Sequence, residues 1–257
     1  MKFCLSSQLS EKLLSQADEI KTKHLKEVKP LLRKFKETTV IYEIQLQDSE
    51  EVFQELDKLE KEYGGRLVCC CRGIDQLIYL HKFYPNLKIY NGFYVTTYLE
   101  ANVCIDNGAL YLKVGAPLTH DLENVSHLAT PIRLTPNIAY EDAIYVDYAI
   151  QGSWIRPEDY EVYDKYDVIY EFEDCENNKT KEATLFDIYK NKKAWAGPVD
   201  YIISNINSNA LNRLIPPDLA KERVKCKQKC LASGRCHLCE NYFALADKDL
   251  LGKILTP

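Results

Sequence analysis

Short runs of β-branched and aromatic residues alternate with stretches of helical periodicity along most of this chain. Such runs are typical of strands, and the apolar spacing of three and four residues between them is typical of amphipathic helices. We therefore predict eight strands, at Lys2–Ser6, Glu19–Lys23, Val40–Gln45, Leu67–Arg72, Leu87–Asn91, Leu110–Gly115, Pro131–Asn137 and Val168–Glu173. We predict helices at Glu11–Ser15, Leu25–Lys36, Glu50–Tyr63, Asp75–Phe83, Thr96–Asn107, Asp121–Leu128 and Ala183–Trp195.

The repeated strand–helix order predicts the fold class. Eight such units with short connections favour an α/β protein whose parallel sheet closes into a (β/α)8, TIM-type barrel. An open, doubly wound sheet is the alternative. No strand is followed by a G-x-G-x-x-G or Walker sequence, which disfavours dinucleotide and P-loop sites. We expect residues 1–205 to form the barrel-like domain and residues 206–257 to form a C-terminal cysteine module and terminal helix, packed on the barrel.

Charged residues alternate with apolar ones in several predicted strands. Successive side chains of a strand point to opposite faces. If the apolar face lies under the helices, the charges point into the barrel, where active sites lie at the carboxyl ends of the strands. Carboxylates there suit acid–base chemistry or metal binding, and arginine suits a phosphate or carboxylate. The candidate catalytic residues are Glu43, Glu171 and Glu173, and the candidate substrate-binding residues are Lys21, Lys23, Lys113, Arg133 and Asn137.

These inward charges have a second interpretation. Buried charges cost several kcal/mol unless they are paired. The same residues, with both signs present, therefore also fit a closed lattice of ion pairs that has no catalytic role.

Four cysteines lie within fourteen residues near the C-terminus, in the pattern C-x3-C-x5-C-x2-C. Thiolates this close in sequence converge on one centre at little entropic cost. Both a [4Fe–4S] cluster and a tetrahedral Zn²⁺ ion fit four cysteine ligands, while disulfides or free buried thiols are the alternatives. The candidate ligands are Cys226, Cys230, Cys236 and Cys239.

Composition narrows the compartment and the partners. The N-terminus lacks the pattern of a secretory signal, so we expect a cytoplasmic protein with reduced thiols. No stretch approaches the ~20 apolar residues that span a bilayer, so no membrane partner is expected. The formal net charge of −5 disfavours bulk nucleic-acid binding, although the basic run Lys221–Lys229 leaves a local nucleic-acid contact open.

Two stretches resemble the collagenase-like peptidase family: LKIYNGFYVTTYLEANVCIDNGALYLKVG, at residues 87–115, and GRCHLC, at residues 234–239. The resemblance implies a barrel with a [4Fe–4S] site, and several members of that family are associated with oxygen-independent hydroxylation of RNA bases or quinones. It supports only the four cysteines as ligands. The present chain departs from the family because its four cysteines lie within fourteen residues, whereas the family spreads them more widely.

Two functions follow as expectations. The first is a cytosolic barrel enzyme, or enzyme component, with a Cys4-ligated iron–sulfur cluster that acts on a polar or anionic substrate such as a nucleobase or a metabolite. The second is a non-enzymatic scaffold with a structural Cys4 zinc site that docks to a protein or nucleic acid. Converging charges at the strand ends favour the first, and a fully paired lattice favours the second.

Overall fold

The computed structural model describes residues 1–115, 118–136, 155–173, 175, 178–192, 221 and 224. Two compact units divide the chain. The first unit comprises Met1–Val114, Leu128–Arg133 and Ile169–Glu171. The second comprises Gly115–His127, Leu134–Val168 and Phe172–Pro257. Each unit is considered by itself below.

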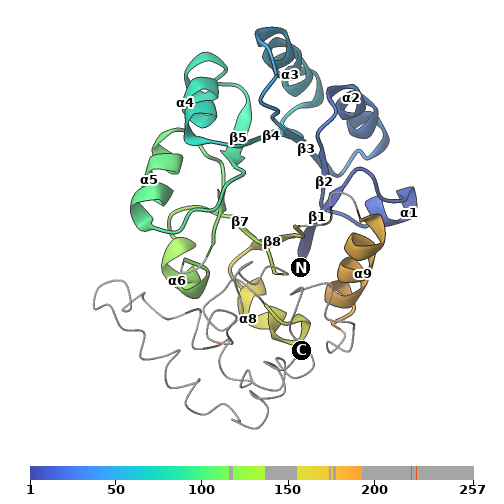
Figure 1. Ribbon diagram of the computed structural model, residues 1–257, viewed down its shortest axis with the longest axis vertical. Helices are drawn as coiled ribbons and strands as arrows, with labels where there is room; N and C mark the ends of the chain where they lie inside the picture. The colour runs from blue at the N-terminus through green and yellow to red at the C-terminus, as the bar shows by residue number, and fades with distance from the viewer. Residues whose placement is uncertain are drawn as a thin grey trace, which may run out of the picture. The chain divides into compact units, whose positions relative to one another are not determined.

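Eight parallel strands form a ring that lies in the first unit except for Leu134 and Val168, and helices α1–α5 lie around it (Figure 1). The strand order is β5-β4-β3-β2-β1-β8-β7-β6. Two isolated bridges, Ile89↔Ala109 and Val95↔Val114, join the β5 and β6 sides, so the barrel is nearly closed. The strands are β1 (Lys2–Ser6), β2 (Glu19–Thr22), β3 (Thr39–Glu43), β4 (Leu67–Cys71), β5 (Lys88–Asn91), β6 (Leu112–Lys113), β7 (Ile132–Leu134) and β8 (Val168–Glu171).

This ring confirms the predicted barrel-like fold class and rules out the open sheet. All eight predicted strands are present, although several are shorter than expected. The helices of the first unit are α1 (Glu11–Leu14), α2 (Leu25–Lys34), α3 (Glu50–Tyr63), α4 (Ile74–Phe83) and α5 (Tyr98–Asp106).

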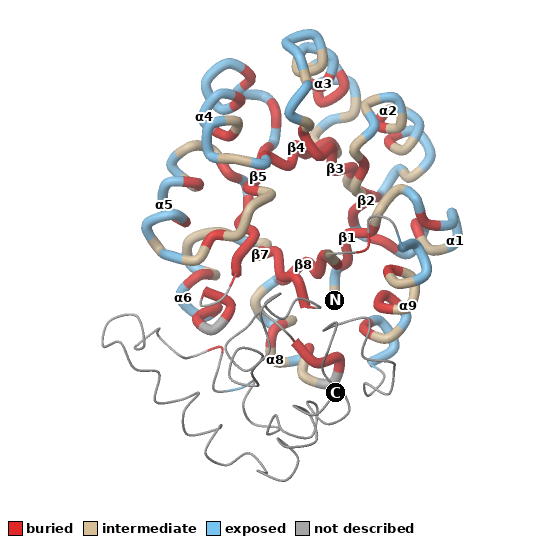
Figure 2. The backbone as a smooth tube through the Cα atoms, in the orientation of Figure 1, coloured by how far each residue is buried: buried red, intermediate tan, exposed pale blue. Residues whose placement is uncertain are grey.

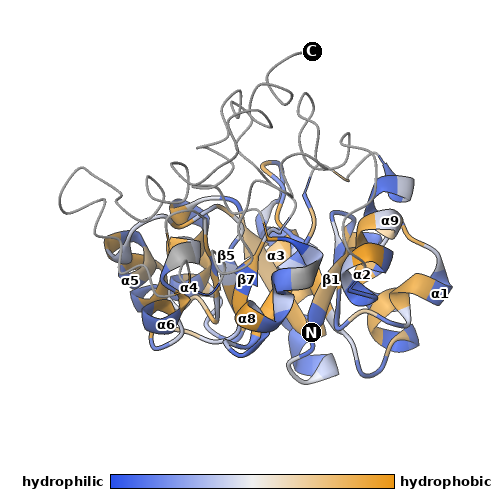
Figure 3. Cartoon of the chain, turned by 90° about the horizontal axis from the view of Figure 1, so that it is seen from below, coloured by the Kyte–Doolittle hydropathy of each residue, from blue (hydrophilic) through white to orange (hydrophobic). Residues whose placement is uncertain are grey.

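Local chemistry sets the ends of these helices. Helix α3 stops at Gly64, which adopts the left-handed conformation with φ of 60° that glycine accepts without a steric penalty. Helix α5 starts with a capping box, in which the Thr97 hydroxyl accepts from the backbone N–H of Glu100 and the Glu100 carboxylate accepts from that of Thr97. The helices carry both hydrophobic and hydrophilic residues, as an outer layer needs (Figure 3).

The strands have two apolar faces. Val40, Tyr42 and Ile44 occupy the face under the helices and are buried, as predicted. The strands are buried nearly throughout, whereas the outer faces of helices α1–α5 are exposed (Figure 2). The opposite alternation forms an apolar cluster inside the barrel, made of Cys4, Ile41, Val68, Cys70, Tyr90, Tyr111 and Ile169.

The second unit holds shorter elements. Its described helices are η1 (Leu118–His120), α6 (Leu122–Val125), η2 (Pro157–Asp159), α8 (Tyr160–Asp164) and α9 (Lys179–Lys190). Tyr189 of α9 is fully buried, and its hydroxyl donates to the carbonyls of Ile155 and Pro136. Only residues 221 and 224 of the predicted C-terminal module are described, so the division at residue 205 stays a prediction. Among the described helices, none has the length and apolarity needed to cross a membrane.

Candidate functional site

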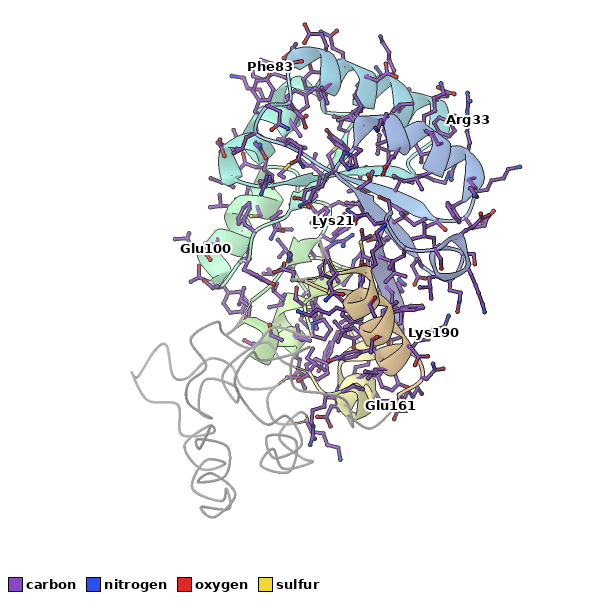
Figure 4. The ribbon with its side chains drawn as sticks, turned by 45° about the vertical axis from the view of Figure 1, so that its right-hand side comes forward. Lys21, Arg33, Phe83, Glu100, Glu161 and Lys190 are labelled. Atoms are coloured by element: carbon purple, nitrogen blue, oxygen red, sulfur yellow. The ribbon has the colours of Figure 1, made fainter. Side chains whose placement is uncertain are left out.

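The inward charges meet inside the first unit. Lys21 on β2 points toward the middle of the ring (Figure 4). Around it lie five further charged side chains from five strands, all with little or no exposure to solvent. We call this set the interior charge cluster: Glu19, Lys21, Glu43, Lys113, Arg133 and Glu171. Strand alternation predicted that five of its six members point into the barrel, and Glu19 is the sixth.

Glu171 is the hub of the cluster. Its Oε1 lies 2.6 Å from Lys21 Nζ and 3.9 Å from Lys113 Nζ, and its Oε2 accepts from Arg133 Nη1 at 3.1 Å. Burial by itself raises the pKa of this carboxyl, but Lys113, Lys21 and Arg133 together outweigh burial and hold the pKa well below its usual range. Glu171 is therefore ionised at neutral pH, which suits it to holding cations in place rather than to donating a proton.

Arg133 occupies the most enclosed part of the cluster and has no exposed surface. Its guanidinium carbon lies 4.2 Å from the centroid of the Tyr90 ring and 4.9 Å from that of Tyr111. Its Nη2 donates to Glu19, whose other oxygen accepts from the Tyr111 hydroxyl at 3.4 Å. Burial raises the pKa of Glu19, although the charge of Arg133 acts in the opposite direction. Sequence reasoning missed Glu19, even though it shares the alternation of Lys21 on the same strand.

The cluster opens at the carboxyl ends of neighbouring strands. Glu43 ends β3, while Lys23 and Arg72 follow the ends of β2 and β4. The Glu43 carboxylate lies 3.0 Å from Lys21 Nζ, 3.7 Å from Lys23 Nζ and 4.0 Å from Arg72 Nε. We call these four residues the carboxyl-edge cluster. Side-chain exposure rises outward, from 8% at Glu43 and 22% at Lys21 to 34% at Lys23 and 46% at Arg72.

Positive and negative charges do not balance at the carboxyl edge. Three cations surround one carboxylate in the carboxyl-edge cluster. The interior behind it adds Lys113 and Arg133 against Glu19 and Glu171, so positive charge remains in excess. Sequence reasoning did not select Arg72, because it lay at the very end of a predicted strand.

Both interpretations of the inward charges find support here. Glu19, Glu43 and Glu171 each have a cationic partner, as a paired lattice requires. Arg133 and Lys113, at 0% and 3% side-chain exposure, belong to that paired interior. The carboxyl-edge cluster differs because its cations are partly exposed and outnumber the carboxylate.

The other predicted site residues lie in the second unit or outside the described residues. Glu173 is partly exposed and belongs to the second unit, whereas Glu171 belongs to the first. Asn137 and the four candidate ligands Cys226, Cys230, Cys236 and Cys239 lie outside the described residues. Within the described ranges, no group of three or more His, Cys, Asp or Glu side chains is arranged to hold a metal ion.

The cysteines of the described part are packing residues. Cys69, Cys70 and Cys71 are buried in β4, as expected for small core side chains. Burial raises the pKa of Cys70 even though Lys21 acts in the opposite direction. It also raises the pKa of Cys104 to about 11. These groups are therefore neutral thiols at pH 7, and neutral buried thiols are poor nucleophiles.

Comparison with known proteins gives little beyond this geometry. No family model and no curated protein matches the chain. Among solved structures, a glycerophosphoryl diester phosphodiesterase from Parabacteroides distasonis is similar, with 13% sequence identity and a TM-score of 0.39. The match covers 56% of this chain and 50% of the phosphodiesterase chain.

Proposed function

We propose that this protein is a barrel enzyme that binds a small anionic substrate at the carboxyl edge of its strands. The observation that carries the proposal is the arrangement of Lys21, Lys23 and Arg72 around Glu43, where cations outnumber carboxylates and become exposed. Active sites of (β/α)8 barrels lie at this end. A phosphate or carboxylate group of the substrate is the complementary ligand.

The residues take different roles in this proposal. Arg72 and Lys23 receive the anion, and the planar guanidinium of Arg72 suits two-pronged binding of phosphate or carboxylate. Glu43 is the carboxylate that lies among these cations, and it serves as the proton acceptor. Glu171 fixes Lys21 through its 2.6 Å contact, and Arg133 and Lys113 hold Glu171. Arg133 and Lys113 thus act as positioning residues rather than as direct contacts of the substrate.

Anion binding tests the carboxyl-edge cluster directly. Titration of inorganic phosphate by calorimetry at low salt should show binding that weakens about tenfold in Arg72→Ala, because a charge-assisted contact worth about 1.5 kcal/mol is lost. Glu43→Gln should have the opposite effect and tighten binding, since it removes the negative charge that competes for the same cations. The opposite signs separate a specific site from a general change in fold.

Arg33→Ala is the matched control. Arg33 is an exposed arginine of α2 whose Nε donates to the Tyr63 hydroxyl at 3.0 Å, away from the strand ends. The Arg33→Ala substitution removes one positive charge, as Arg72→Ala does, and should leave phosphate binding unchanged. Equal losses in Arg33→Ala and Arg72→Ala, or no phosphate binding by the intact protein, would exclude the proposed site.

We further propose that Cys226, Cys230, Cys236 and Cys239 hold a [4Fe–4S] cluster, with Zn²⁺ as the alternative. The support is the donor set, because four thiolates within fourteen residues match the ligands that both centres take. A cluster would supply electron transfer, whereas zinc would supply folding stability. Zinc together with a lack of anion binding would favour the scaffold function over the enzyme.

Metal analysis distinguishes these centres. Protein purified without oxygen should contain about four iron and four sulfide per chain and absorb near ~400 nm, whereas one zinc per chain would make the centre structural. Cys236→Ser should lower the metal content, and Cys104→Ser, at a buried cysteine of α5, should leave it unchanged. Protein with neither metal would contradict the proposal.

A further inference from the structure

Exposed apolar side chains concentrate on one side of the first unit. Among the described residues, helix α4 exposes Ile74, Ile78, Tyr79 and Phe83, with Phe83 at 56%. Figure 4 shows Phe83 at the periphery of the first unit, away from the strands. Helices α2 and α3 expose no large apolar side chain of this kind. Burying such a face against a partner is favourable, and large exposed apolar patches mark interaction sites.

The order of side chains along α4 favours a second copy of the same helix as the partner. Ile74, Ile78 and Lys82 form one row spaced by four residues, and Asp75, Tyr79 and Phe83 form the adjacent row, so all six share one helix face. This face is self-complementary. An antiparallel copy, related by a two-fold axis between Ile78 and Tyr79, would set Asp75 against Lys82, Ile74 against Phe83 and Ile78 against Tyr79.

Contacts within a single chain also hold the side chains of this α4 face in place. The Tyr79 hydroxyl donates to Glu50 Oε2 at 2.6 Å, and its ring centroid lies 4.9 Å from that of Phe83 and 6.0 Å from that of Phe53. Lys82 Nζ lies 5.2 Å from the centroid of the Phe83 ring. Side chains ordered in advance lose less entropy on binding, which favours association.

We propose that helix α4 forms the two-fold interface of a homodimer. A two-fold interface brings the same patch of both subunits together, so it requires the self-complementary order that α4 has. Helix α5 lies next to α4 in the ring (Figure 1), and it also exposes two apolar residues, Leu99 and Val103. A specific interface needs roughly 1,000 Å² of buried surface, so the dimer requires area beyond α4, and α5 is the neighbouring helix that can supply it.

Sedimentation velocity of the full chain over a concentration series tests the dimer. The intact protein should approach twice the mass of one chain as concentration rises. Ile78→Glu should shift it to the mass of one chain, because a charge would be buried at the centre of the interface without a partner. Glu11→Lys, an exposed change on α1, should leave dimerisation unchanged.

A charge exchange tests the register and does not depend on Ile78. Asp75→Lys and Lys82→Asp, each alone, place like charges opposite each other twice and should raise the dissociation constant about tenfold or more. Mixing the two variant chains should restore dimerisation, because each introduced charge then faces an opposite one. A monomeric intact protein, or single variants that dimerise as well as their mixture, would overturn the proposed interface.

Discussion

Arg133→Met should destabilise the protein by about 3–5 kcal/mol, because it removes the cation that two buried carboxylates share. Arg133 has no exposed surface and contacts both Glu19 and Glu171. Glu171 keeps Lys21 and Lys113, whereas the hydroxyl of Tyr111 is the contact described for Glu19 once Arg133 is gone. Urea denaturation at pH 7 measures the loss as a change in the free energy of unfolding.

The assignment of this loss to Glu19 can be tested in the same background. Adding Glu19→Gln to Arg133→Met should recover about 1 kcal/mol or more, since a buried amide costs less than an unpaired carboxylate. Arg33→Met changes an exposed arginine and should leave the free energy of unfolding nearly unchanged. If Arg133→Met is no worse than Arg33→Met, or if Glu19→Gln adds to the damage, the buried pair does not carry the stability we assign to it.

The barrel could be predicted because the sequence shows both the strand periodicity and the helix periodicity. Strand alternation separates apolar from charged residues with a period of two, and this alone placed Lys21, Glu43 and Glu171 on one face. Helix boundaries followed where a local signal exists, as for α3, which was predicted at the observed limits Glu50–Tyr63. Strand β6 was overestimated because the predicted Leu110–Gly115 has strand composition throughout, yet only Leu112–Lys113 pairs as a strand.

The contacts that decide the chemistry of the cluster could not be predicted in the same way. Tyr90 and Tyr111 resemble ordinary core residues in sequence, and their role beside Arg133 depends on strands β5, β6 and β7 meeting in space. Arg72 is one residue beyond its strand, where alternation no longer specifies a direction. The spacing of the four C-terminal cysteines predicts a shared ligand set but contains no information on geometry, so their role stays a prediction.

The exposed face of α4 was missed for a different reason. Its apolar residues fit an amphipathic helix, and the sequence does not tell which of its apolar residues remain outside the core. Ile78 and Leu80 look alike in sequence, although Leu80 is buried and Ile78 is 43% exposed. The self-complementary order of the helix becomes meaningful only when its six residues are known to face solvent together.

Glu171→Gln should remove much of the pH dependence of stability on the acid side. The pKa of Glu171 is lower in the folded protein than in the unfolded chain, where the pKa of a glutamate is about 4.3. Its contribution is therefore complete above that value and is lost as the pH falls through and below it. At pH 7 the variant should be less stable by about 3 kcal/mol, because Lys21, Lys113 and Arg133 then share a neutral partner.

The difference in the free energy of unfolding between the intact protein and Glu171→Gln should therefore become smaller as the pH falls from 5 toward 3. Urea denaturation at each pH measures this difference. Glu11→Gln, which alters an exposed pair with Lys34, should run parallel to the intact protein. Glu19 titrates in the opposite sense, because its raised pKa makes protonation favour the fold as the pH falls. The charge of Glu171 contributes to the raised pKa of Glu19. The Glu171→Gln variant should therefore gain less stability from protonation of Glu19 at low pH than the intact protein does. If this difference in the free energy of unfolding stays constant from pH 7 to pH 3, Glu171 is not the ionised carboxylate that holds Lys21 in place. The carboxyl-edge cluster, which includes Lys21, would then not depend on Glu171.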